Sequence, residues 1–216
     1  VHEVELSGLQ PATRYQYRIQ TGEVVDGPYV FRTLPAPEDE ATIRLVASSD
    51  MQRDDARPEL FDELIAEGVV PFMTAEFGPN LEEAIDALLI PGDLVDNGWI
   101  YEEWEIDFFA AAAEVLSAVP VYPVPGNHEA GSFYFFRYFN LPANGFDEHW
   151  YHTDLSNVRL IGLDSNGGHK GSEQLSWLDV VLASTCDAEH VDFVVAQLHH
   201  PYRSEVWTPG NTDWTG

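Results

Sequence analysis

The spacing of apolar and polar residues changes along the chain and divides it into two parts. In the first part, Tyr15, Tyr17 and Ile19 alternate with polar residues, which is the period-two pattern of a half-buried β-strand. A second apolar run, residues 29–33, follows a turn signal at residues 26–28. The N-terminal part is therefore predicted to consist of β-structure.

From residue 41 onward, short apolar runs alternate with segments of helical spacing, which predicts an α/β fold. Strands are expected at residues 43–47, 87–90, 121–124, 158–163 and 191–198. One helix is predicted to begin near Asp54 or Asp55 and to end before Gly68, and another to cover residues 101–118. The side chains expected in the core are Leu60, Phe61, Leu64 and Ile65 in the first helix and Trp104, Phe108, Val115 and Leu116 in the second.

A proline-rich, charged segment, residues 35–40, has the composition of a linker between the two parts. Before it, Leu9 to Tyr15 resembles the corner of a fibronectin type III domain, where a tyrosine ring packs over a turn. We therefore expect residues 1–34 to be the C-terminal part of an all-β, fibronectin III-like domain that is truncated at its N-terminus. The alternative is a hairpin that belongs to the main domain.

Acidic side chains dominate the composition, with 37 Asp and Glu against 10 Lys and Arg and a net charge of −27. Nucleic acids and anionic membranes need basic side chains for affinity, so neither is expected as a partner. No apolar stretch approaches the ~20 residues of a membrane-spanning helix. A phosphorylated substrate would also be repelled, so a phosphate site needs local positive charge, for which metal ions are the obvious source.

The single cysteine, Cys186, excludes a disulfide framework within the chain and a cysteine-based zinc site. The acidic composition fits an exported protein and equally a protein kept soluble in high salt. We expect an extracellular or periplasmic location, although no targeting segment stands before Val1. The oligomeric state is left open.

Polar residues that can bind metal follow the predicted strands: Asp50, Asp93, Asn127 and His199. Because open α/β sheets bind ligands at the carboxyl ends of their strands, these four side chains should converge. Carboxylate, amide and imidazole groups together suit Fe, Mn or Zn. One Asp after a strand is more often a helix cap than a ligand, but four such sites argue against coincidence.

The motifs around these residues follow the order found in the calcineurin-like metallophosphoesterase family, which the chain resembles over residues 41–216. They are Asp50-Met51-Gln52, residues 92–98 (Gly-Asp-Leu-Val-Asp-Asn-Gly), residues 126–129 (Gly-Asn-His-Glu) and His199-His200-Pro201. The resemblance implies a four-layer α/β sandwich of two mixed β-sheets flanked by helices. The fibronectin-like lead-in is similar to that of purple acid phosphatases.

The resemblance also implies two divalent or trivalent metal ions. Asp50 would bind the first metal, Asp93 would bridge both, and Asn127 and His199 would hold the second. Gln52 stands where the family has a histidine; its amide oxygen could still coordinate, but less well than imidazole.

Further roles are implied outside the ligand set. His128 would donate a proton or hydrogen bond to the leaving oxygen, and Asp96 would orient His128. Purple acid phosphatases have a tyrosine at the position of Asp96, so their charge-transfer colour is not expected. Candidates for substrate binding are His169, His200, Tyr202 and Arg203.

The resemblance implies hydrolysis of phosphate esters by a hydroxide bound to two metals, with in-line attack on phosphorus. Small phosphomonoesters are the first expected substrates and phosphodiesters the second. Because of Gln52, a non-catalytic homologue that binds a phosphorylated ligand or scaffolds a surface complex stays an alternative. The family's last motif, Gly-His-x-His, is missing, so residues 41–216 are expected to be a catalytic domain incomplete at its C-terminus, with little activity alone.

Overall fold

The strands of the protein form three small sheets in the computed structural model, which describes residues 3–39, 41–167 and 171–201. The strands are β1 (Arg14–Thr21), β2 (Val24–Arg32), β3 (Leu45–Ala47), β4 (Ala87–Pro91), β5 (Val121–Val124), β6 (Tyr151–Leu155), β7 (Val158–Gly162) and β8 (Phe193–Gln197). The five strands predicted for the α/β part all form, with bounds that differ by one or two residues for most of them.

Helical segments connect and cover these strands. They are α1 (Leu60–Glu63), α2 (Val70–Phe77), α3 (Leu81–Ala84), α4 (Tyr101–Glu103), α5 (Ala113–Leu116), α6 (Phe133–Tyr138), α7 (Ser172–Cys186), the π-helical segments Leu64–Val69 and Trp104–Ala110, and a short 3-10 turn, Pro37–Asp39. None of the helices in the described part of the chain is long and apolar enough to span a membrane.

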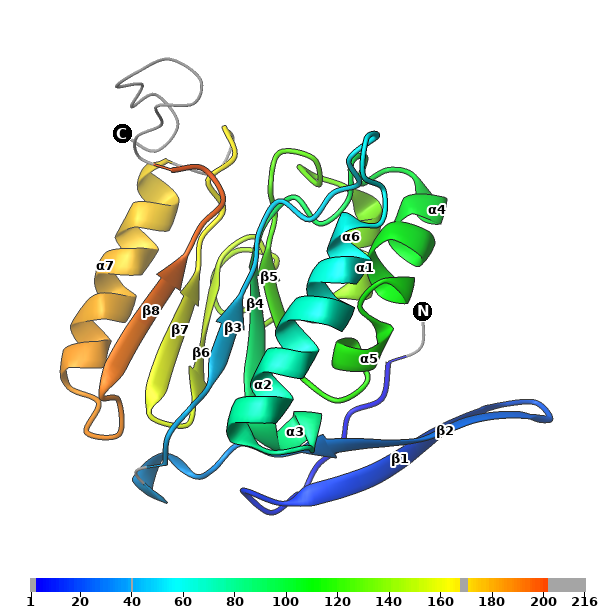
Figure 1. Cartoon of the computed structure of the whole chain (residues 1–216). Helices are drawn as coiled ribbons and strands as arrows, with labels where there is room; N and C mark the ends of the chain where they lie inside the picture. Colours follow the sequence, from blue (N-terminus) through cyan, green and yellow to red (C-terminus); the bar gives the residue numbers. More distant parts are fainter. Residues whose placement is uncertain (1–2, 40, 168–170, 202–216) are drawn as a thin grey trace.

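Two three-stranded sheets lie next to each other at the centre of the molecule, with helices on the outer sides (Figure 1). Strands β3, β4 and β5 are parallel, whereas β7 pairs antiparallel with β6 and parallel with β8. The Tyr151 hydroxyl donates to the Pro123 carbonyl across the two sheets at 2.9 Å. The four-layer α/β prediction is confirmed, and among the described strands only the second sheet is mixed.

The core continues up to the loop that follows β4. Residues 87–90 of β4 are all buried, as expected for a central parallel strand covered on both faces. Trp104 and Phe108 are fully buried, which confirms part of the predicted face of the second helix. The Trp104 indole N–H donates to the Gly98 carbonyl at 2.8 Å. The aromatic core thereby anchors the far end of the loop that carries Asp93.

The first helix differs from its prediction in both bounds and face. It begins at Leu60 and runs as α1, a π-helical segment and α2 to Phe77, so the predicted end before Gly68 is wrong. A helix tolerates one glycine at a cost of about 1 kcal/mol, and burial of Met73 beyond it stabilises the continuation. Gly78, at φ 113°, follows the true end.

The predicted start and core face of this helix need correction as well. Asp54 accepts hydrogen bonds from the backbone of Ala56 and Arg57, so it stabilises a turn before the helix. Of the four side chains expected in the core, Phe61 and Ile65 are buried, whereas Leu60 and Leu64 are exposed. Phe61 and Ile65, four positions apart, form the buried stripe of this helix, and Leu60 and Leu64 lie on the exposed flank beside it.

The N-terminal strands β1 and β2 form an antiparallel hairpin that lies below the side of the molecule formed by β3, β4, β5 and their helices (Figure 1). The Tyr17 hydroxyl donates to the Ser117 carbonyl at 2.7 Å, and Arg14 forms an ion pair with Glu82. The Tyr15 hydroxyl accepts from the Gln10 backbone at 2.8 Å. The hairpin thus contacts the α/β part directly, and its assignment to a fibronectin III-like domain stays a prediction.

Candidate metal centre

Three of the predicted metal ligands meet at the carboxyl edge of the sheets. Asp50 follows β3, Asp93 follows β4 and His199 follows β8. One ligand atom from each of them lies within 4.8 Å of the other two. Convergence at this edge is what parallel strands impose on the residues that follow them. The loop geometry has therefore brought together residues that are up to 149 positions apart, as the sequence predicted.

The His199 ring is oriented as a metal ligand requires. Its Nδ1 lies 2.9 Å from the Pro91 carbonyl, which can only accept, so Nδ1 carries a proton. Its Nε2 lies 3.1 Å from Asn127 Oδ1 and 3.2 Å from Asp93 Oδ2. A carbonyl on the other ring nitrogen is the usual support of a metal-bound histidine. Asn127 therefore joins the group, as predicted.

The backbone beneath these ligands is strained. Asp50 and Asp93 have φ values of 55° and 54°, in the left-handed region that non-glycine residues seldom adopt. The two loops are tied together, because Asp50 N donates to the Gly92 carbonyl and Met51 N donates to the Asp93 carbonyl, at 3.2 and 2.9 Å. Strain of this kind persists where the surrounding structure holds it, and it is concentrated at functional sites.

Position 126 requires a glycine, because Asp93 lies so close to its backbone that no side chain fits between them. A Cβ atom on Gly126 would lie 2.1 Å from Asp93 Oδ1 and 2.4 Å from Asp93 N, so one of the two loops would have to move. We expect Gly126→Ala to lower metal affinity strongly, measured by calorimetric titration with Mn²⁺. The control is Gly68→Ala, whose Cβ would meet only Leu64 Cδ1 at 3.7 Å. Equal metal affinity of the two variants would contradict the geometry.

The histidines and carboxylates at this edge shift one another's pKa. Burial alone would raise the pKa of Asp93, but hydrogen bonds from His199 and from the His128 backbone outweigh it and lower this pKa. Burial would lower the pKa of His199, but the hydrogen bond to Asp93 raises it. The Asp93 charge is thus the stable form, ready to bind cations.

His128 lies beside the ligands. Its Nδ1 hydrogen-bonds the backbone carbonyl of Asp96, whose carboxylate Oδ1 is 3.5 Å away, and its Nε2 is 3.7 Å from Asp93 Oδ2. Burial would lower the pKa of His128, but the contacts with Asp96 and Asp93 raise it. The predicted contact between Asp96 and His128 is therefore present, mainly through the backbone, and it leaves Nε2 facing the centre.

The donor set fits metal ions. Two carboxylates, one imidazole and one amide oxygen meet, which is a mixture suited to borderline divalent or trivalent metals. In addition, the Gln52 side-chain oxygen is buried and has no hydrogen-bond partner among the described residues. An unpaired buried amide oxygen is costly, and a cation would satisfy it. The ligand role of Gln52 stays a prediction.

The predicted substrate-binding residues are only partly described. His169, Tyr202 and Arg203 lie outside the described residues. His200 is buried at 2% exposure, and its Nδ1 lies 2.8 Å from the Ser165 hydroxyl, behind the His199 ring. This places His200 as a support of the loop after β8; its substrate contact stays a prediction.

The sequence analysis assigned no role to Glu129, although it quoted the motif that contains this residue. Its side chain is fully buried and accepts hydrogen bonds from the backbone of Asp93, Leu94, Val95 and Gly126. Burial raises the pKa of Glu129, and the backbone donors offset part of this rise. The signal in the sequence was an acidic residue in the last position of the Gly-Asn-His-Glu motif.

Asp164 and Asn166, which follow β7, were also missed. The Asn166 amide donates to the carbonyls of Pro125 and Gly126, both at 3.2 Å, and so joins the second sheet to the loop of Asn127. Asp164 is buried and contacts His149 Nδ1 at 2.6 Å. The His149 ring packs on Phe136.

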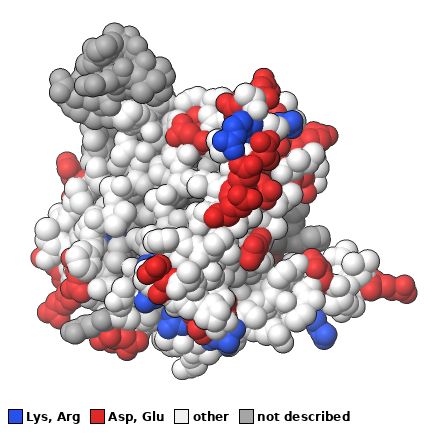
Figure 2. Space-filling model, viewed as in Figure 1, with Lys and Arg blue, Asp and Glu red and all other residues white. Residues whose placement is uncertain are grey.

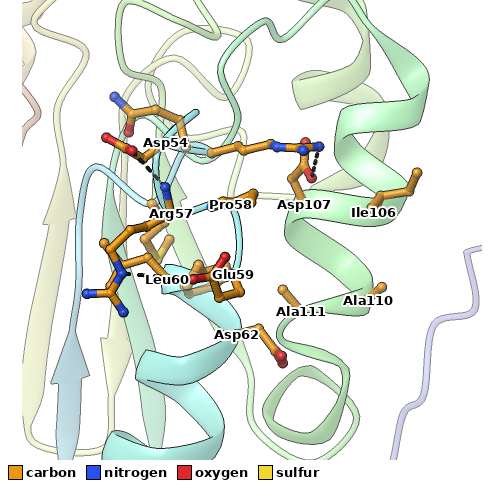
Figure 3. A pocket seen from close by; sticks show the side chains of 14 residues that line it. Asp54, Arg57, Pro58, Glu59, Leu60, Asp62, Ile106, Asp107, Ala110 and Ala111 are labelled. Carbon is orange, nitrogen blue, oxygen red and sulfur yellow. Dashed lines mark hydrogen bonds and ion pairs between the residues drawn. The ribbon is translucent and has the colours of Figure 1, made fainter.

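A cavity of about 410 Å³ adjoins the centre (Figure 3). Met51 and Gln52, whose backbone N–H groups donate to the Asp93 carbonyl, form part of its lining. Figure 3 shows Arg57 and Leu60 on one wall and Asp107 on the opposite helix. Arg57 and Asp107 both line the cavity, so it carries both signs of charge.

The surface itself is strongly acidic. Figure 2 shows acidic side chains spread over the visible face, with basic side chains in a few small groups. With a net charge of −27, the protein would repel an anionic substrate at a distance. Bound metal and protonated histidine would supply positive charge at the centre, and Arg53 and Arg57 supply it in the adjoining cavity.

Known proteins resemble this chain in sequence and in fold. The model of the family described as calcineurin-like phosphoesterase matches residues 43–215. A protein of Fibrobacter succinogenes, described as a probable cyclic nucleotide phosphodiesterase, is 34% identical over 135 residues, covering 60% of this chain and 47% of that protein. This chain thus spans about half the length of that curated relative.

The fold has a solved counterpart. The structure of a purple acid phosphatase from yellow lupin (Lupinus luteus) seeds matches 92% of this chain and 38% of its own, with a TM-score of 0.69 and 22% identity. This likeness concerns the fold alone. Because the family model covers residues 43–215, including every predicted ligand, the chain belongs to the calcineurin-like phosphoesterase family.

Proposed function

We propose that the protein hydrolyses phosphate esters with metal ions held by Asp50, Asp93, Asn127 and His199. The observation that carries the proposal is the convergence of Asp50, Asp93 and His199 within 4.8 Å at the carboxyl edge of the strands. Asp93 offers a ligand atom within 4.8 Å of those of Asp50 and His199, so it would be the carboxylate that two ions share. When bound, such ions offset the charge of phosphoryl oxygens and lower the pKa of a coordinated water.

The chain's own residues would orient the ester and handle the leaving group. Asp96 holds His128 Nδ1 through its carbonyl, so Nε2 faces the space beside Asp93. The raised pKa of His128 favours the protonated ring, which can donate from Nε2 to the oxygen that leaves phosphorus. The Asn127 amide would complete the ligand set without adding negative charge.

Phosphomonoesters are the proposed first substrates, as the sequence motifs favour. A phosphodiester is the second candidate, because the relative that is 34% identical is described as a probable cyclic nucleotide phosphodiesterase. A non-catalytic homologue that binds a phosphorylated ligand is the alternative function, because Gln52 stands where the family has a histidine ligand.

The test uses the full-length protein freed of metal by a chelator. Mn²⁺, Fe²⁺ and Zn²⁺ are added in turn, and hydrolysis of an aryl phosphomonoester and of a bis-aryl phosphodiester is followed by absorbance. We expect turnover that requires metal and is lost again on chelation. Tight metal binding without hydrolysis of either ester would favour the non-catalytic alternative.

A further inference from the structure

We propose that Glu129 is a positioning residue of the metal centre. Its buried carboxylate joins the loop of Asp93 to the loop of Asn127 and so fixes the spacing of their ligand atoms. The proposal rests on the proposed function only in treating these two side chains as metal ligands.

The contacts of Glu129 cross between the two loops. Oε2 accepts from Asp93 N at 2.9 Å and from Gly126 N at 3.0 Å, so one oxygen holds both loops. Oε1 accepts from Leu94 N at 2.8 Å and from Val95 N at 3.2 Å. The two oxygens thereby use all four of their lone-pair directions, which only an ionised carboxylate can offer.

Packing alone does not explain an acidic side chain at this position. The Glu129 side chain is 0% exposed, and a buried carboxylate is costly unless donors compensate for lost water. The compensating donors seen in the described residues are backbone N–H groups. An apolar side chain of similar volume would fill the space without this cost, so the carboxylate is best explained by the loop geometry it imposes.

The loop of Asp93 needs this acceptor. Asp93, Leu94 and Val95 are 3%, 0% and 0% exposed, so water cannot replace Glu129 as the partner of their N–H groups. The left-handed backbone of Asp93 turns these consecutive N–H groups toward one point. Without the carboxylate the loop has to rearrange to pair its N–H groups, and the Asp93 side chain moves with it.

The test compares Glu129→Gln with Glu82→Gln in the full-length protein. Glutamine keeps the volume of Glu129 but places an N–H₂ donor against backbone N–H groups. Glu82 is a matched control, because it is 7% exposed and lies away from the centre, paired with Arg14. Three quantities are measured: affinity for Mn²⁺ by calorimetry, stability of the metal-free protein in urea, and hydrogen exchange of the amides of residues 93–95.

We expect Glu129→Gln to lower Mn²⁺ affinity roughly 10- to 100-fold, the range seen for residues that support metal ligands. Amide exchange at residues 93–95 should accelerate even without metal. Glu82→Gln should change neither quantity, even if it lowers urea stability as much. Glu129→Asp keeps the charge but is one methylene shorter, so it should fall between wild type and Glu129→Gln.

Each other outcome overturns the proposal. Wild-type affinity in Glu129→Gln would show that the carboxylate does not set the ligand geometry. An equal loss of affinity in Glu82→Gln, or failure of both Glu129 variants to fold, would assign Glu129 to general stability. If the wild type itself binds no Mn²⁺, the ligand assignment and the proposed function fail. The role of Glu129 is refuted separately if amide exchange at residues 93–95 is unchanged in Glu129→Gln.

Discussion

Asp93→Asn in the full-length protein is expected to lower kcat by several orders of magnitude and to weaken metal binding. Asp93 lies within 4.8 Å of the ligand atoms of both Asp50 and His199, and its pKa is lowered by the neighbouring histidines. Asparagine keeps the shape but removes the negative charge that two cations would share. The loss should therefore appear in metal stoichiometry as well as in turnover.

The measurement combines metal analysis of the purified variant with steady-state hydrolysis of an aryl phosphate. Asp86→Asn is the matched control, because Asp86 is also buried and accepts from a backbone N–H, that of Arg44, but lies at the other end of β4. Asp86→Asn should keep its metals and its kcat. Two tightly bound metals and near-normal turnover in Asp93→Asn would refute the bridging role.

His128→Ala is expected to keep the metals and to lose turnover by roughly 10²- to 10⁴-fold, the range of a general acid. The ring lies 3.7 Å from Asp93 Oδ2, beside the ligands, and its Nδ1 is held by the Asp96 carbonyl. Because the raised pKa of His128 favours a protonated ring, removal of the ring removes a proton donor. The loss should be smallest for substrates whose leaving group needs no proton.

The test measures kcat for a series of phosphate esters that runs from aryl to alkyl leaving groups. His190→Ala is the control, since His190 pairs with Asp154 and belongs to none of the motifs that surround the metal centre. A steeper dependence on leaving-group pKa in His128→Ala than in wild type would support the assignment. An equal loss for aryl and alkyl esters would argue against a leaving-group role.

The strand pattern in the sequence determined where the predicted ligands lie. Short apolar runs followed by Asp50, Asp93, Asn127 and His199 predicted that these residues lie together at the carboxyl ends of strands, an edge that two adjacent sheets provide. The contact of Asp96 with His128 was implied by the family resemblance. The convergence at the strand ends depends on local spacing and on the geometry that parallel strands impose on it, so no knowledge of distant contacts was required for it.

Local signals failed where packing at a distance decided the outcome. Gly68 is a typical signal for a helix end in the sequence. The helix nevertheless continues to Phe77, because burial of Met73 stabilises the part beyond Gly68. Leu60 and Leu64 have the spacing of core residues, yet of the four side chains predicted for this face only Phe61 and Ile65 are buried.

The fine geometry of the centre was decided only by the tertiary structure. The left-handed backbone of Asp93, the four N–H groups on Glu129 and the Asn166 bridge to the loop of Asn127 join segments that are distant in the chain. Strand pattern determines where a ligand lies along an edge, because it fixes which residue follows each strand. Hydrogen bonds between loops determine how the ligand is held, because buried N–H groups must find acceptors wherever the fold places them.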